Sequence, residues 1–288
     1  MPALTAGALS PVLNRFSIHP GPTRSIVVGT ASQLAQLGEV TVSGMLLSKQ
    51  IVTLDPATGK RAVALGKSGG TYVTNAEDGD LHFCLGTVQG QPHIAYELQN
   101  AKAWVAEFNA ARGSPVTVTG FFRCMFEHPG FRSNDDAHIF EIHPVRAVAF
   151  AQKLQAFDVG VPDQKSLHTW STRLSQQDAA ISVTYDAAKD TLTFSGMGDG
   201  DTNYVFGLKG QVSAITLKPA SSEPASFTFD CKPIGHPVKV ICLKGTSAAL
   251  QLAKLKKTSI TLTALRNIDL PLALKNKYVI NLLGIAIA

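Results

Sequence analysis

Alternating apolar and polar residues predict β-strands along most of the first half of the chain. Successive side chains of a strand point to opposite faces, so a period of two indicates a sheet with one buried face. Runs of this kind occupy 25–28, 40–45, 69–73, 81–85, 93–98, 116–122 and 139–148. The first half is therefore expected to be dominated by β-sheet.

One helix is predicted among these strands, at 99–112. Ala101, Trp104 and Phe108 recur at helical spacing, and Gly113 is a natural stop. Several strands, a helix before the penultimate strand and a final strand pair are the order of an OB-type barrel. The first half therefore predicts one such barrel.

The second half repeats this order of elements. Five segments of the first half have counterparts in the second half, offset by 140–158 residues. The matched pairs are 40–45 with 192–197, 82–86 with 240–245, 99–112 with 247–255, 116–120 with 260–264, and 138–145 with 278–285. Five matches in one order predict two copies of a single domain.

The predicted fold class is all-β with minor helix, arranged as two tandem OB-like five-stranded β-barrels. Pro, Gly and Ser are frequent in 1–35, which is expected to be an irregular N-terminal arm. The first barrel is then expected at 36–150, a connector at 151–178 and the second, basic barrel at 179–288.

Two acid–imidazole pairs stand on strands that otherwise have the pattern of buried sheet. Asp80 and His82 share one face of their strand, and Glu141 and His143 share one face of theirs. Imidazoles and carboxylates together suit zinc, manganese or iron, so these four residues are a candidate metal site, with Glu97 as a further ligand. The alternatives are a structural network in which the same groups hydrogen-bond one another and a polar binding surface.

The first copy of the repeat alone carries both acid–imidazole pairs. The alignment sets these four residues against mostly apolar positions of the second copy, which are Val238, Val240, Asn281 and Leu283. Burying unpaired charge is costly, so the ionisable groups are expected to pair, to bind a cation or to lie at an opening of the barrel.

The formal net charge of +5 resides in the second half. Residues 1–178 carry 14 Lys+Arg and 14 Asp+Glu, whereas residues 179–288 carry 12 and 7. Basic side chains on an OB-type barrel can follow a phosphate backbone while an aromatic side chain stacks on a base. The candidate nucleic-acid contacts are Lys254, Lys256, Lys257, Arg266, Lys275, Lys277 and Tyr278.

Four cysteines, Cys84, Cys124, Cys231 and Cys242, form no C-x-x-C pair, which disfavours a zinc ribbon or a redox motif. They are expected to be reduced, buried thiols. No secretory signal is visible, and no apolar run approaches the roughly 20 residues of a membrane-spanning helix. The sequence therefore predicts a cytoplasmic protein with no membrane partner.

The stretch 75–148 resembles OB-like domains of poorly characterised bacterial proteins. The motifs that carry the resemblance are Asp-Gly-Asp-x-His at 78–82, Glu97, Val-x-Val-x-Gly at 116–120 and Glu-x-His-Pro-Val at 141–145. The resemblance covers roughly a quarter of the chain and implies a small β-barrel without a settled activity. The second half lacks both acid–His motifs, so a role of these residues does not transfer to it.

The leading functional hypothesis is a non-enzymatic protein that binds single-stranded nucleic acid, DNA or RNA, through the second barrel. Neither a Gly-x-Ser-x-Gly elbow nor a P-loop is present, and no cofactor is expected apart from a divalent metal. The alternative is a metal-dependent hydrolase that uses Asp80, His82, Glu141 and His143, with one carboxylate as general base. A third hypothesis is a structural module that associates with copies of itself.

Overall fold

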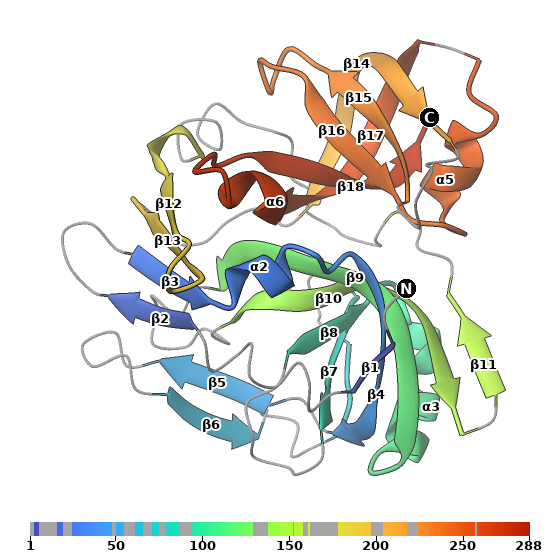
Figure 1. The fold of residues 1–288 in the computed structure, drawn as a ribbon. Helices are drawn as coiled ribbons and strands as arrows, with labels where there is room; N and C mark the ends of the chain where they lie inside the picture. Colours follow the sequence, from blue (N-terminus) through green and yellow to red (C-terminus); the bar gives the residue numbers. More distant parts are fainter. Residues whose placement is uncertain are drawn as a thin grey trace.

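The computed structural model contains two closed β-barrels, one above the other (Figure 1). It describes residues 3–5, 16–19, 25–47, 50–54, 61–65, 71–74, 79–86, 94–128, 138–151, 153–157, 161, 178–196, 204–217, 224–256 and 258–288. Five strands form the first barrel: β4 (Glu39–Leu47), β7 (Leu81–Gly86), β8 (Ala95–Leu98), β9 (Pro115–His128) and β10 (His138–Phe150). β4 pairs with β7, β7 with β8, β8 with β10 and β10 with β9, and β9 returns to β4 and closes the ring.

The second barrel has the same connectivity. Its strands are β14 (Tyr204–Thr216), β15 (Ala225–Asp230), β16 (Val238–Cys242), β17 (Ser259–Ile268) and β18 (Ile280–Ile287). They close in the order β14-β15-β16-β18-β17. In both barrels the third and fifth strands run parallel and the other pairs run antiparallel. The predicted tandem OB-like barrels are therefore confirmed.

A helical segment joins the third and fourth strands of each barrel. These segments are η1 (Ala101–Trp104) with α3 (Val105–Ala111) in the first barrel and α5 (Ser247–Leu252) in the second. Phe108 of α3 is fully buried against the core, as the helical spacing predicts. The side chain of Thr246 accepts a hydrogen bond from the Ala249 amide and so caps the start of α5. A further short helix, α6 (Leu270–Ala273), lies between β17 and β18.

Short strands extend the first barrel or lie beside it. β1 (Ala3–Thr5) runs parallel to β4, and β11 (Lys153–Ala156), within the predicted connector, pairs with β10. A separate hairpin consists of β5 (Gln50–Leu54) and β6 (Arg61–Leu65).

A four-stranded sheet joins the N-terminal part of the chain to the segment that precedes the second barrel. It consists of β2 (Phe16–His19), β3 (Ser25–Gly29), β12 (Ser182–Asp186) and β13 (Thr191–Ser195), in the order β12-β13-β3-β2. α2 (Ala31–Leu34) follows β3, and the Ser32 amide and hydroxyl both donate to the Asp190 carboxylate at 2.9 Å. The arm predicted to be irregular thus contains regular strands, and the strands of the second barrel begin at Tyr204.

Two of the five predicted repeat matches are wrong. The strand equivalent to β4 is β14, because each is the first strand of its ring, whereas the predicted counterpart at 192–197 belongs to β13 in the separate sheet. By the same criterion β7 corresponds to β15, so Asp80 and His82 have no counterparts at Val238 and Val240 on β16. Alternation with period two is common to all strands, and only the pairing partners distinguish one from another.

The barrels are in contact through the outer surfaces of β9 and β17. Phe121 of β9 packs in a buried cluster with residues of the second barrel, which are Tyr204, Leu243, Leu265, Leu283 and Ile285. Only 5% of the Phe121 surface remains exposed. This apolar cluster adjoins the polar contacts between the barrels.

The four cysteines are buried thiols, as predicted. Burial raises the pKa of the Cys242 thiol to about 12, so this thiol stays protonated at neutral pH. None of the helices in the described part of the chain has the length and apolarity that a membrane crossing requires.

A substitution at Gly120 tests how closely β9 approaches β10 in the first barrel. A Cβ atom at this position would lie 2.6 Å from Ile142 Cγ2 and 2.7 Å from the Pro144 carbonyl oxygen. Gly120→Ala is expected to lower the free energy of unfolding by about 1–3 kcal/mol through overpacking. Gly38→Ala is the matched control, since its nearest neighbour would be Phe121 Cε2 at 3.9 Å. Urea denaturation measures both variants, and equal stabilities would contradict the close approach of β9 and β10.

Candidate functional site

The outer face of the first barrel carries ionisable side chains on neighbouring strands. His82 on β7 lies opposite Glu97 on β8, and Glu141 on β10 lies opposite Arg123 on β9. Side chains alternate along a strand, so His143 shares the face of Glu141. The fold therefore brings the two predicted acid–imidazole pairs into one cluster.

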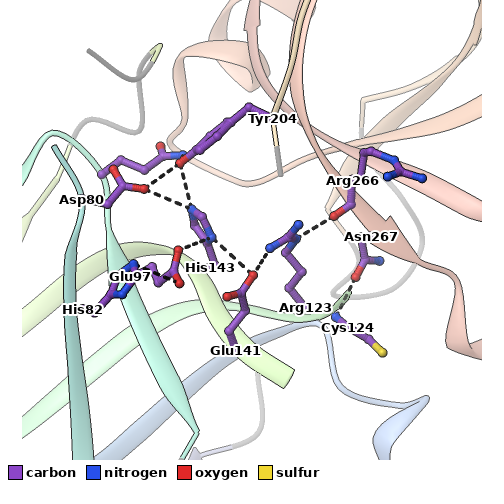
Figure 2. A network of polar contacts seen from close by, with 11 residues as sticks. Asp80, His82, Glu97, Arg123, Cys124, Glu141, His143, Tyr204, Arg266 and Asn267 are labelled. Atoms are coloured by element: carbon purple, nitrogen blue, oxygen red, sulfur yellow. Dashed lines mark hydrogen bonds and ion pairs between the residues drawn. The ribbon is translucent and has the colours of Figure 1, made fainter. Parts of the chain in front are cut away.

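His143 lies at the centre of this cluster and is fully buried (Figure 2). Its Nδ1 lies 2.9 Å from Glu97 Oε2 and 3.4 Å from Glu141 Oε1. Its Nε2 lies 3.0 Å from the Tyr204 hydroxyl and 4.0 Å from Asp80 Oδ2. Three carboxylates of the first barrel and one phenol of the second thus surround a single imidazole.

Tyr204 extends the cluster across the boundary between the barrels. Its hydroxyl donates to Asp80 Oδ2 at 3.0 Å and accepts from Gln99 Nε2 at 2.5 Å. Burial, followed by the charges of Asp80 and Glu97, raises the pKa of Tyr204 well above its ordinary value. Tyr204 therefore remains a neutral phenol. Its hydroxyl proton is directed to Asp80, and the same oxygen lies within hydrogen-bond distance of His143 Nε2.

Arg123 forms the second connection between the barrels. Its guanidinium pairs with Glu141 in the first barrel, and its Nε donates to the Arg266 carbonyl oxygen in the second at 2.6 Å. One residue further along β9, the Cys124 amide donates to Asn267 Oδ1 at 3.0 Å. Arg123 is completely buried, so these contacts are shielded from solvent.

An uncharged pair occupies the corresponding place in the second barrel. Asn267 and Asn281 face each other across β17 and β18 as Arg123 and Glu141 do across β9 and β10. Asn267 Nδ2 donates to Asn281 Oδ1 at 2.7 Å. The predicted correspondence of Glu141 with Asn281 agrees with this register, and it sets a charged pair against a neutral one.

Of the predicted nucleic-acid contacts, Arg266 lies inside the molecule and Tyr278 is partly buried. Arg266 is completely buried and donates through one amino group to both carboxylate oxygens of Asp178, at 2.5 and 2.6 Å. Tyr278 is partly buried, donates to Asp178 at 3.4 Å and stacks edge-on against Phe194. In this conformation the Arg266 guanidinium is unable to reach a phosphate group outside the barrel.

The predicted lysines are divided between two ends of the second barrel. Lys254 and Lys256 follow α5, Lys275 and Lys277 follow α6, and all four are exposed. α5 and α6 lie at opposite ends of the barrel (Figure 1). Lys257 lies outside the described residues. The four described lysines therefore do not form one patch, because the two pairs follow helices that lie at opposite ends of the barrel.

Two hollows flank the connection between β17 and β18. The first hollow measures about 210 Å³ and lies between the barrels, where its lining includes Gln36, Phe121, Lys239, Ile241, Asp269 and Pro271. The second hollow measures about 440 Å³ and is lined by Asp178, Ala179, Ile234, His236, Pro237, Val238, Tyr278, Val279 and Ile280. Both hollows belong chiefly to the second barrel.

Three of the buried groups have the spacing of metal ligands. Asp80, Glu97 and His143 each offer one ligand atom, and these atoms lie within 4.8 Å of one another. Of the other predicted ligands, His82 contacts Glu97 at 3.2 Å and Glu141 pairs with Arg123. The three groups line neither hollow and are at most 2% exposed. Burial therefore shields these three groups from solvent.

The sequence prediction missed three residues of the network. Arg123 was detectable in principle, because it interrupts the apolar run from Phe121 to Phe126. Gln99 and Tyr204 carry no such signal, since a tyrosine in a strand and a glutamine after one are ordinary. Their role depends on a contact between two barrels that the sequence does not specify.

Comparison with known proteins adds little to this description. No family model and no curated protein matches the chain. A solved structure of a replication protein A heterotrimer bound to single-stranded DNA aligns with 10% sequence identity and a TM-score of 0.19. The alignment covers 80% of this chain and 45% of that one, and a likeness this weak carries no argument about function.

The Arg123–Glu141 pair provides a test of the network. Arg123→Met leaves Glu141 and the Arg266 carbonyl without this guanidinium, and is expected to cost about 3–5 kcal/mol of unfolding free energy. Arg123→Met combined with Glu141→Gln should recover part of that loss, because the buried negative charge is then removed. Urea denaturation of the four-member cycle measures the coupling.

The surface pair Asp186–Lys189, at 3.2 Å, supplies the control. Lys189→Met should leave the stability close to that of the wild type, because solvent screens an exposed pair. Additive effects of Arg123→Met and Glu141→Gln would contradict the proposed interaction.

Proposed function

We propose that this protein is a non-enzymatic binding protein that takes single-stranded nucleic acid at the β17–β18 connection of its second barrel. One observation carries the proposal: the two hollows lie on either side of this connection, and exposed Lys275 and Lys277 stand within it. OB-folds bind oligonucleotides on the face of their second and third strands, bordered by the loop between the fourth and fifth. The β17–β18 connection is that loop.

The chemistry of the two hollows suits a single strand. Lys239 and Ile241 on β16 contribute a cationic and an apolar side chain to the first hollow. Tyr278 and His236 contribute aromatic rings to the second. Lysines that neutralise phosphates and rings that contact bases are the two components of binding without sequence preference.

The first barrel is a poor alternative for the same ligand. Its second and third strands, β7 and β8, direct Glu97 and His82 to the outer face, where the cluster is covered by Tyr204 of the second barrel. The covered face is also acidic, which would repel phosphate. Buried position and charge therefore both favour the second barrel as the binding surface.

The lysines at the two ends of the second barrel allow a matched test. Lys275→Gln/Lys277→Gln and Lys254→Gln/Lys256→Gln remove equal charge, so long-range electrostatics change alike. Fluorescence anisotropy with a labelled mixed-sequence oligonucleotide, measured over a series of salt concentrations, gives the affinity and its salt slope. Lys275→Gln/Lys277→Gln should bind more weakly, and the slope of log affinity against log salt concentration should fall in magnitude by about 1.4, at about 0.7 per lost phosphate contact. Lys254→Gln/Lys256→Gln should bind as the wild type does.

Equal effects of the two variants would place the binding elsewhere. Binding that is absent, or that does not weaken as salt rises, would refute the proposal. Parallel experiments with DNA and RNA of the same sequence identify the preferred strand.

A further inference from the structure

The buried cluster around His143 has features that a hydrogen-bond network alone does not require. Its ligand atoms come from three strands or strand ends of the first barrel and face a phenol of the second (Figure 2). We propose that Asp80, Glu97 and His143 form a structural site for a divalent transition-metal ion, and that this ion fastens the two barrels together next to Tyr204. The site is independent of the nucleic-acid surface proposed above.

The distances suit one ion. Two ligand atoms that each lie about 2.0–2.2 Å from Zn²⁺ are separated by at most about 4.4 Å. His143 Nε2 and Asp80 Oδ2 are 4.0 Å apart. Glu97 also offers a ligand atom, and one atom from each of the three residues lies within 4.8 Å of the other two. The geometry therefore needs little rearrangement to accept an ion.

The donor atoms and their supports also match a transition-metal site. Imidazole with two carboxylates suits zinc and its neighbours better than calcium or magnesium, which prefer oxygen alone. A metal-bound histidine usually donates its second ring N–H to a carboxylate. Two carboxylates, Glu97 at 2.9 Å and Glu141 at 3.4 Å, face Nδ1 of His143 and can orient the ring while Nε2 faces the ion.

A second observation comes from Gln99, which is 4% exposed. Its Nε2 lies 2.5 Å from the Tyr204 hydroxyl, which itself lies 3.0 Å from both His143 Nε2 and Asp80 Oδ2. Its Oε1 is buried and accepts no hydrogen bond from any residue that the structure describes. Buried amide oxygens are almost always satisfied, so this atom points to a further partner such as an ion or its bound water.

Burial defines the role of the ion. The three ligands are 0–2% exposed and lie where the two barrels meet, so the ion would act on stability and on the docking of the barrels. Metal binding that occurs only in the folded state stabilises that state by mass action. Removal of the metal should therefore loosen the boundary between the barrels before it disturbs either barrel.

The test uses the full chain, purified without a metal-affinity tag. Elemental mass spectrometry of the protein as purified should find one transition-metal ion per chain. After a chelator wash, added Zn²⁺ should raise the unfolding temperature in a concentration-dependent manner, and Mn²⁺ offers a comparison. Asp80→Asn, which preserves size and shape, should lower the Zn²⁺ affinity by at least about tenfold, as measured by calorimetric titration.

His236→Gln is the control, because it removes an exposed imidazole that lines the second hollow. This variant should bind Zn²⁺ as the wild type does. If Asp80→Asn fails to fold, Glu97→Gln replaces it, and the absorption spectrum of Co²⁺ added to the wild-type chain reports the coordination directly. The absence of stoichiometric metal together with an unchanged unfolding temperature overturns the proposal, as does Zn²⁺ binding that neither ligand variant weakens.

Discussion

The structure depends on satisfying a set of charged groups that are buried where two barrels meet. Asp80, Glu97, Glu141 and His143 belong to the first barrel, and removing such groups from water costs several kcal/mol each in the absence of partners. The partners are Arg123 from the same barrel and Tyr204 from the other. Because the second barrel supplies part of the compensation, the first barrel in isolation would expose these groups to solvent, and the pair of barrels behaves as one unit.

This constraint also distinguishes the corresponding surfaces of the two barrels. In the first copy, the surface that OB-folds commonly use for ligands is occupied by the polar cluster and covered by the second barrel. In the second copy, Asn267 and Asn281 replace a charged pair, and the corresponding surface remains beside two hollows. The first barrel therefore uses this surface for contact with the second barrel, whereas the second barrel leaves it beside the two hollows.

The sequence predicted the five strands of the first barrel, the two helical segments and the tandem barrels because these features depend on local periodicity. The strand predicted at 69–73 is wrong, since residues 71–74 form none. It also predicted that Asp80, His82, Glu141 and His143 would converge, since faces of neighbouring strands are readable from alternation. It did not identify β14 and β15 as the counterparts of β4 and β7, because one alternating strand resembles another. Arg266 was misassigned to the surface, since its partner Asp178 lies 88 residues away in the chain.

The amino-acid sequence by itself determined the tandem OB-like architecture and the presence of acid–imidazole pairs in the first copy only. Both follow from local patterns in the sequence, which are the spacing of apolar residues and the positions of acidic residues and histidines on the predicted strands. The tertiary structure decided that Tyr204 and the Arg266 carbonyl complete the cluster, that Arg266 is buried, and that the lysines separate to two ends of the second barrel. These outcomes depend on how the two barrels dock and on which end each loop reaches, and such long-range geometry leaves no periodic trace in the sequence.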